Sequence, residues 1–285
     1  MVVVLLGGAG AHDLRVMSFN IRYGTAPDSA DAWETRRGLL VETIRAFDPD
    51  LLATQECLAA QAEYLRGALP EYGFVGVGRD DGQLAGEMCA IFYRKASLHV
   101  AAEGHLWLSD TPAVPGSRGW DAALPRIASW ALLRLADDTL ATLRFVDTHF
   151  DHVGVEARAQ SARLLCERFG TADRAAVVIA GDFNAPAEPD RAGPYRTLTQ
   201  PGAGCATPFI DSYRSLHPPD AAENTYHAFR GALSGPRIDW ILVSPAVVPL
   251  DASIVHLSRD GRYPSDHFPV TAVLRMAGTA AAARR

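Results

Sequence analysis

Apolar residues along the chain gather into short runs that are typical of β-strands. The runs are rich in Val, Ile, Leu and Phe and are bounded by Gly, Pro, Asp or Asn. Several of them, such as 177–184, begin as almost continuous apolar stretches, which indicates strands that are buried. The pattern predicts strands over 14–21, 50–57, 72–78, 87–94, 98–109, 126–135, 140–150, 177–184, 237–244, 253–258 and 269–276.

Other segments show the wider spacing of amphipathic helices. In 32–47, the apolar residues Trp33, Leu40 and Ile44 recur at near-helical intervals, and Asp31 is expected to cap the first turn. The remaining predictions are helices over 58–69 and 154–169, a short helix that ends near Gln200, and a long surface loop rich in Pro and Gly over 110–125.

No linker or charge run divides the chain, and polar residues end strands in both halves, so both halves are expected to face one cleft. A strand, a helix and a strand that ends in an acid occur twice, up to Glu56 and again up to Asp182. Two such halves, packed sheet to sheet, would place helices outside and two mixed sheets inside, although any α/β chain resembles itself to some extent. We therefore predict one α/β domain over 13–276, with an irregular leader over 1–12 and a disordered tail over 277–285.

The sequence GDFN at 181–184 ends one predicted strand with polar groups. Asp182 and Asn184 are two residues apart, so in a strand they point to the same face. Alternatively, both side chains bond to their own backbone in a turn.

Polar residues end or border many of the other apolar runs. A buried carboxylate destabilises the fold by roughly several kcal/mol unless it is paired or binds a metal, so caps alone explain this many polar groups poorly. Carboxylates at the ends of buried strands suggest a hard cation. The residues concerned are Asn20, Glu56, Glu87, His149, Asp182, Asn184, Asp239, Asp266 and His267.

The order of short motifs resembles one known family. The chain contains, in sequence, SFNIR, TQE, GEMCAIFYR, PRIASW, DTHF, GDFN, RIDWILV and SDHFPV. This order resembles the endonuclease/exonuclease/phosphatase superfamily, and GDFN followed by SDH is its most specific part. The resemblance implies an α/β fold, a four-layer α/β/β/α sandwich with two packed mixed β-sheets, whose active site lies where the strand ends of both sheets meet. It is nearest to bacterial members of unassigned specificity and, more distantly, to the deadenylase/nocturnin group.

The resemblance also implies a metal-dependent phosphoric ester hydrolase that uses Mg²⁺ or Mn²⁺. Glu56 would bind the ion with the help of Asn20 and Asp266. Asp182 would orient or deprotonate the attacking water, and Asn184 would hold a phosphate oxygen. Such an ion typically takes few protein carboxylates and keeps water and phosphate oxygens as its other ligands.

The same resemblance assigns the histidines to the phosphoryl group. His267 would bind a phosphoryl oxygen and be oriented by Asp239, and His149 would do likewise, oriented by Glu87. A carboxylate behind each histidine would raise its pKa, so that both imidazoles could donate to phosphate near neutral pH. Arg126 would supply a guanidinium to the phosphate. Neutralising the charge of the nonbridging oxygens in this way lowers the barrier to phosphoryl transfer.

Several candidates have structural alternatives of similar weight. Arg126 and Arg158 could be surface arginines rather than phosphate contacts. His152, like Arg158, could either contact the phosphate or lie on a solvated surface. Trp120 and Asp121 could line the mouth of the site, or Trp120 could pack on the core.

Composition and charge narrow the range of substrate classes. The 285 residues carry a formal net charge of -6 and a single lysine, Lys95, which disfavours a nucleic-acid backbone as the partner. A small soluble phosphorylated metabolite, such as a sugar phosphate or nucleotide, is the favoured substrate. The alternative is a nuclease or 3′-exonuclease for RNA or single-stranded DNA, and a third possibility is a non-catalytic binding module. A nuclease would stack bases on aromatic side chains, for which Trp107, Trp120, Tyr226 and Phe229 are candidates.

The four cysteines form no CxxC pair or zinc-like spacing. We expect Cys57, Cys89, Cys166 and Cys205 to be reduced and structural, which suggests a cytoplasmic protein. No apolar run approaches the length of a membrane span, and we expect a monomer without a membrane partner.

Overall fold

The computed structural model describes residues 13–136, 141–170, 176–188, 190, 192–219 and 222–276. The leader predicted over 1–12 and the tail predicted over 277–285 lie outside the described residues.

One sheet has six strands in the order β11-β12-β1-β2-β4-β3. Only β1 and β2 pair in parallel, and the other neighbours are antiparallel. Its strands are β1 (Asp13–Asn20), β2 (Leu51–Cys57), β3 (Tyr72–Val75), β4 (Met88–Arg94), β11 (Val247–Ile254) and β12 (Val270–Met276).

The other sheet also has six strands, in the order β5-β6-β7-β8-β10-β9. Again one central pair, β7 and β8, is parallel and the rest are antiparallel. Its strands are β5 (Leu98–Trp107), β6 (Ile127–Leu135), β7 (Thr142–His149), β8 (Ala176–Asp182), β9 (Ile210–Asp211) and β10 (Asp239–Val243). The predicted repetition is therefore present, because each sheet has a helix-linked parallel pair at its centre.

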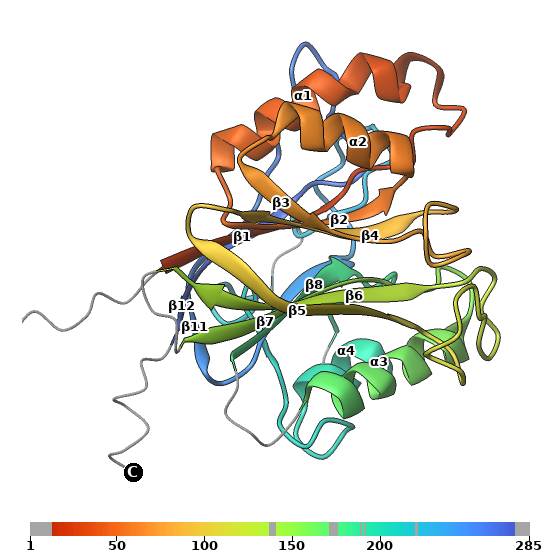
Figure 1. Cartoon of the computed structure of the whole chain (residues 1–285), viewed down its shortest axis with the longest axis vertical. Coiled ribbons are helices and arrows are strands. Elements are labelled where there is room, and N and C mark those ends of the chain that lie inside the picture. Colours follow the sequence, from red (N-terminus) through yellow and green to blue (C-terminus); the bar gives the residue numbers. More distant parts are fainter. Residues whose placement is uncertain are drawn as a thin grey trace, which may run out of the picture.

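Helices cover the outer face of each sheet, which gives the predicted four-layer α/β/β/α sandwich (Figure 1). The first sheet carries α1 (Trp33–Phe47) and α2 (Ala59–Ala68), and the second carries α3 (Val155–Phe169) and α4 (Pro194–Thr199). A short 3-10 helix, η1 (Ser29–Asp31), precedes α1. None of the described helices is long and apolar enough to cross a membrane.

The three largest of four apolar clusters among the described residues hold the layers together. The central one fills the space between the two sheets with residues such as Val16, Ile91 and Phe145. The other two lie between each sheet and its helices, around Leu40 and Leu165. Strands at the centre of the sandwich are thus buried on both faces, which explains why their sequences are continuously apolar.

Two predicted features differ from the structure. Asp31 does not cap α1: the N-cap position is Ala32, without a side-chain hydrogen bond, and Asp31 belongs to η1. The strand predicted over 253–258 instead runs over β11, from Val247 to Ile254. Because β11 is an edge strand with Pro249 and exposed Asp251 at a register shift, its apolar pattern is weak.

A polar pair is buried between the two sheets. Gln55 Nε2 on β2 donates to Asp147 Oδ1 on β7 at 2.6 Å. Gln55 Oε1 and Asp147 Oδ2 are both buried without a hydrogen-bond partner. Burial raises the pKa of Asp147 well above its usual value, although the hydrogen bond from Gln55 lowers it. A protonated Asp147 would satisfy the orphaned oxygen of Gln55.

We expect Asp147→Asn to gain stability relative to the wild type as the pH rises. The unfolded chain releases the proton of Asp147 at a pKa of about 3.9, whereas the folded protein retains it to higher pH. The wild type therefore loses about 1.4 kcal/mol of unfolding free energy per pH unit above that value, until the pKa of the folded state is reached. Asparagine does not titrate and keeps a donor for Gln55. Denaturant unfolding of both proteins across this pH range measures the difference, and a difference that does not change with pH would contradict the prediction.

The prediction of four reduced cysteines was wrong for two of them. Cys166 in α3 and Cys205, 39 residues later, form a disulfide, whereas Cys57 and Cys89 are free and buried. Disulfides persist mainly in oxidising compartments. The cytoplasmic location therefore stays a prediction without support from the cysteines.

Removing this disulfide should lower the free energy of unfolding by about 2–4 kcal/mol, because the cross-link restricts the unfolded chain. The test is the Cys166→Ser/Cys205→Ser double variant, unfolded in denaturant with and without reductant. Reductant should destabilise the wild type and leave the double variant unchanged. Equal stability of the wild type in both conditions would show that the bond contributes nothing.

Candidate active site

Strand ends from both sheets converge at one end of the sandwich. Asn20 ends β1, His149 ends β7 and Asp182 ends β8. His149 lies opposite Asp182 in the parallel pair, and Asp239, the first residue of β10, lies opposite Asp182 on the other side. The apolar parts of these strands thus hold their polar last residues at fixed neighbouring positions.

The backbone departs from regular strand geometry where it presents the polar side chains. Glu56 has φ 60° at a register shift between β2 and β4, and Asn184 has φ 47° just after β8. Such left-handed conformations cost non-glycine residues about 1–3 kcal/mol, and they concentrate at functional sites. Gly181 is required beside them, because a Cβ there would collide with the carbonyl oxygen of Thr148.

A cleft of about 490 Å³ opens at this end of the sandwich. Asn20 and Asp239 do not line it, but both hydrogen-bond to residues that do. Of the predicted site residues, the cleft is lined by Glu56, Glu87, Arg126, His149, Asp182, Asn184, Asp266 and His267.

Asp182 lies at the centre of this group. Its Oδ1 accepts the backbone N–H of Asn184 at 2.9 Å, and its Oδ2 accepts from Asn20 Nδ2 at 3.0 Å. The same Oδ2 lies 3.4 Å from His149 Nε2 and 3.8 Å from His267 Nε2. Burial raises the pKa of Asp182 to about 7, and the Asp239 carboxylate adds to this shift. The group can therefore gain or lose a proton near neutral pH.

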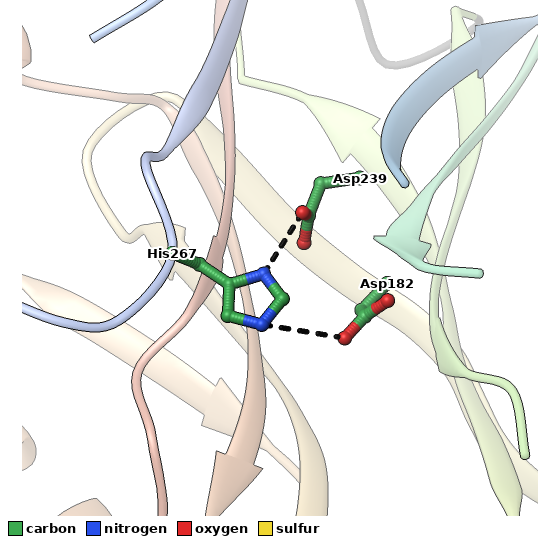
Figure 2. A group of neighbouring side chains, drawn as sticks. All are labelled: Asp182, Asp239 and His267. Atoms are coloured by element: carbon green, nitrogen blue, oxygen red, sulfur yellow. Dashed lines mark hydrogen bonds and ion pairs between the residues drawn. The ribbon is translucent and has the colours of Figure 1, made fainter. Parts of the chain in front are cut away.

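His267 and Asp239 form a tightly paired dyad. His267 Nδ1 donates to Asp239 Oδ2 at 2.9 Å, and its Nε2 points towards Asp182 (Figure 2). Burial lowers the pKa of His267, but the carboxylates of Asp239, Asp182 and Asp266 outweigh it and raise the pKa to about 10. The imidazole is therefore protonated at neutral pH and presents a donor at Nε2.

His149 has the opposite character. Its Nδ1 is 4.0 Å from Glu87 Oε2 and has no hydrogen-bond partner, because the Glu87 carboxylate pairs with Arg79 at 2.7 and 2.9 Å. Burial, together with the positive charges of Arg126 and Arg79, lowers the pKa of His149 well below its usual value. The predicted rise in pKa was thus wrong for His149. This neutral imidazole accepts a hydrogen bond at Nε2 from Asn184 Nδ2, at 3.0 Å.

Arg126 is buried, which excludes the alternative of a surface arginine. Its Nε lies 3.3 Å from Asp151 Oδ2, and its Nη2 donates to His152 Nδ1 at 2.8 Å. Its third nitrogen, Nη1, is buried without a hydrogen-bond partner. A buried guanidinium with an unused donor at the cleft is suited to an anion.

Residues 17–267 match the sequence profile of the endonuclease/exonuclease/phosphatase family. The chain belongs to this family. A solved family protein from Bacteroides thetaiotaomicron is 34% identical, with a TM-score of 0.84 over 94% of this chain and 99% of that one. A mannosyl-6-phosphatase from the same organism is 35% identical, with a TM-score of 0.81 over 92% of this chain and 99% of that one.

A mimivirus protein, Uncharacterized protein L388 of Acanthamoeba polyphaga mimivirus, is 31% identical over 182 residues, which are 60% of this chain and 67% of that protein. Family members are phosphoester hydrolases, and this chain is one of these phosphoesterases. The third possibility, a non-catalytic binding module, is therefore wrong.

Members of the endonuclease/exonuclease/phosphatase family are generally dependent on a divalent metal ion, and the oxygen ligands near Glu56 fit one. Glu56 accepts from Asn20 Nδ2 and from the backbone N–H of Tyr23, both at 3.0 Å, so each oxygen keeps a free lone pair. Asp266 lines the same cleft, with Arg22 Nε 3.8 Å from its Oδ2. Burial raises the pKa of Asp266, as expected for a carboxylate without a full counter-charge.

Asn20 presents its amide nitrogen, not its oxygen, to the carboxylates. Nδ2 donates to both Glu56 and Asp182, while Oδ1 accepts the backbone N–H of Arg22 at 3.0 Å. In this arrangement Asn20 holds the two carboxylates apart and in place.

Asp182, Asp239 and His267 also bring three potential ligand atoms within 4.8 Å of one another. His267, however, would offer a nitrogen rather than an oxygen ligand, and its Nδ1 already donates to Asp239 Oδ2. The oxygen-rich side of the cleft at Glu56 and Asp266 is the better match for a hard cation.

The rim differs from the sequence predictions. Asp121 accepts the backbone N–H groups of Glu156 and Ala157, so it stabilises the start of α3. His152 lines the cleft, whereas Trp120 and Arg158 do not. Arg158 instead donates to the carbonyl oxygen of Asp151. Sequence reasoning missed the cleft-lining residues Arg22 and Tyr23, although Arg22 is the last residue of the SFNIR motif.

Proposed function

We propose that the protein hydrolyses a phosphate ester of a small soluble phosphorylated metabolite, with Mg²⁺ or Mn²⁺ as its metal ion. The observation that carries this proposal is the meeting of Glu56, Asp182 and His267 in one cleft of about 490 Å³. The 35% identity to a mannosyl-6-phosphatase along almost the whole chain supports a phosphorylated sugar as the substrate class.

In this proposal Asp182 orients the attacking water and accepts its proton. A pKa near 7 suits a general base at neutral pH. His267, protonated and held by Asp239, donates from Nε2 to a phosphoryl oxygen, and the unused Nη1 of Arg126 binds another. Both groups neutralise charge that grows on the phosphoryl oxygens during the reaction.

Asn184 and His149 would act together on the other side of Asp182. Asn184 Nδ2 donates to His149 Nε2 and to the carbonyl oxygen of Phe150, both at 3.0 Å. A phosphate oxygen bound by Asn184 would therefore replace His149 as one acceptor. His149 would then bind a phosphoryl oxygen as the tautomer with its proton on Nε2, because the tautomer that accepts from Asn184 has no proton there to donate.

Glu56, with Asp266 facing the same cleft, would hold the metal ion, and Asn20 would keep Glu56 in position. When bound, the ion supplies positive charge to the phosphoryl oxygens. Glu87 makes no hydrogen bond to His149, since its Oε2 lies 4.0 Å from Nδ1, and its proposed role is indirect, through the ion pair that fixes Arg79 near the imidazole.

A nucleic acid is the less favoured substrate. Among the aromatic residues considered for base stacking, Trp107 is buried and donates to the carbonyl oxygen of Arg79, so it offers no stacking surface. Tyr226 is 48% exposed and lines the cleft. One exposed ring and a net charge of -6 suit a single sugar or base better than a polynucleotide.

The test is hydrolysis of a panel of sugar phosphates, nucleotides and single-stranded oligonucleotides in the presence of Mg²⁺. We expect phosphate release from sugar phosphates or nucleotides. Cleavage of oligonucleotides alone would reject the small-metabolite proposal in favour of a nuclease.

A further inference from the structure

A second cavity adjoins the catalytic cleft at Asn184. Its volume is about 530 Å³, and Asn184 is the one described residue that lines both spaces. Volumes of about 300–1,000 Å³ are typical of small-molecule sites. A substrate whose reacting group lies beside Asn184 could therefore extend into this space.

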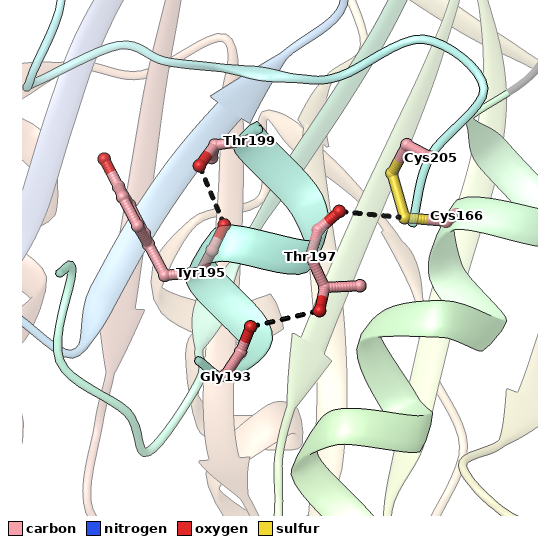
Figure 3. The surroundings of a disulfide bond; sticks show 6 residues. All are labelled: Cys166, Gly193, Tyr195, Thr197, Thr199 and Cys205. Atoms are coloured by element: carbon pink, nitrogen blue, oxygen red, sulfur yellow. Dashed lines mark hydrogen bonds between the residues drawn. A yellow bond between two sulfur atoms is a disulfide. The ribbon is translucent and has the colours of Figure 1, made fainter. Parts of the chain in front are cut away.

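The walls of the second cavity are α3, the segment after β8, and α4 with the turn that follows it. The disulfide between Cys166 and Cys205 ties α3 to the chain just beyond this turn (Figure 3). Thr197, which lines the cavity, donates to the carbonyl oxygen of Gly193 at 3.0 Å, and its own carbonyl oxygen lies 3.7 Å from Cys166 Sγ. These links hold opposite walls of the cavity together, as a preformed binding site requires.

The lining of this cavity is positively charged in a protein that is negative overall. Among the described residues it includes three arginines, Arg158, Arg163 and Arg196, and a single carboxylate, Glu188. No described residue forms an ion pair with any of the three guanidinium groups. Arg158 is held by its hydrogen bond to Asp151 O at 2.8 Å, and Asp151 also contacts Arg126 of the catalytic cleft. Guanidinium groups without an ion pair that line one cavity are typical of phosphate recognition.

We propose that this second cavity binds a second phosphate group of the substrate, carried by the leaving group. The inference rests on the proposed function and narrows its substrate class to small bisphosphorylated metabolites. In the reaction, the oxygen of water bonds to the phosphorus beside Asn184, and the ester P–O bond breaks. The leaving alcohol gains a proton, and its own phosphate stays intact in the arginine-lined cavity.

The experiment compares kcat/KM for a hexose bisphosphate and the matching hexose monophosphate. We expect the wild type to show a kcat/KM for the bisphosphate at least about tenfold higher, because its second phosphate gains charge-assisted hydrogen bonds to the arginines. In the Arg163→Gln/Arg196→Gln double variant, the ratio of kcat/KM for the bisphosphate to that for the monophosphate should fall close to one. Both arginines are exposed, so the variant should fold. Arg168→Gln, at an exposed position in the last turn of α3 outside the cavity, is the matched control and should keep the preference.

The outcomes separate this inference from the proposed function. Hydrolysis of both esters without preference, or a preference that survives in the double variant, would overturn the second phosphate site while leaving the proposed function intact. Absence of hydrolysis of any small phosphate ester by the wild type would overturn the proposed function itself. Cleavage of oligonucleotides that depends on the two arginines, without bisphosphate hydrolysis, would overturn both.

Discussion

Replacing Asp182 by asparagine is expected to lower kcat by about 10³-fold, since a well-placed general base contributes about 10²–10⁴-fold. Asparagine has nearly the same shape and can still accept the backbone N–H of Asn184, but it cannot take a proton from water. Its amide nitrogen would also face the Nδ2 donor of Asn20. The measurement is steady-state hydrolysis of the best ester from the substrate panel.

The loss should come without unfolding. Asp182 is a buried carboxylate with a raised pKa, so making it neutral removes a desolvation cost that offsets the lost hydrogen bond from Asn20, and the melting temperature should not fall. Asp251→Asn, at an exposed position on β11, is the matched control and should retain full activity. Wild-type activity in Asp182→Asn would show that Asp182 is not the base.

Metal removal should have a similarly large effect. Chelation of divalent ions is expected to abolish hydrolysis, and added Mg²⁺ or Mn²⁺ should restore it. In Glu56→Gln, the Mn²⁺ concentration needed for half-saturation should rise by more than about tenfold. Even loss of a group that only holds a metal ligand in place typically weakens metal affinity about 10–100-fold.

Metal binding can be followed separately from activity, by titrating Mn²⁺ and measuring the free ion by electron paramagnetic resonance. Glu63→Gln, at an exposed position on α2, is the control for the charge change and should bind as the wild type does. If Glu56→Gln bound Mn²⁺ with unchanged affinity, the ion would have to lie elsewhere, for example beside Asp182 and Asp239.

The fold could be predicted because its main signal is local. Buried central strands such as β8 read as continuous apolar runs, and α3 shows its buried stripe directly in the sequence. The edge strand β11 could not be placed well. Its residues face solvent on one side, and it pairs only with β12. The place of β12 is set in turn by its pairing with β1, which lies more than 250 residues earlier in the chain.

The composition of the site was also predictable, but its electrostatics were not. The sequence motifs predicted the same role for His149 and His267, whereas the structure gives the two imidazoles opposite protonation states. The difference arises because Asp239 contacts His267 directly, while Glu87 is diverted from His149 by Arg79. Whether a carboxylate reaches an imidazole at 2.9 Å or stops at 4.0 Å depends on side-chain packing that no motif records.

The disulfide could not be predicted from the sequence either, because it too depends on packing between distant segments. Cys166 lies on a helix and Cys205 in a loop after another helix, without a spacing that marks them as a pair. Their contact follows from the packing of α4 on α3, which also builds the arginine-lined cavity.

A crystal structure with Mn²⁺ and inorganic phosphate, in which the anomalous signal locates the metal ion, would test whether metal and phosphate meet in this cleft. We predict a manganese peak within ligand distance of Glu56, and a phosphate that contacts both His267 Nε2 and Arg126. A manganese peak away from Glu56, or a phosphate bound outside the cleft that Asp182 and His267 share, would contradict the proposed function.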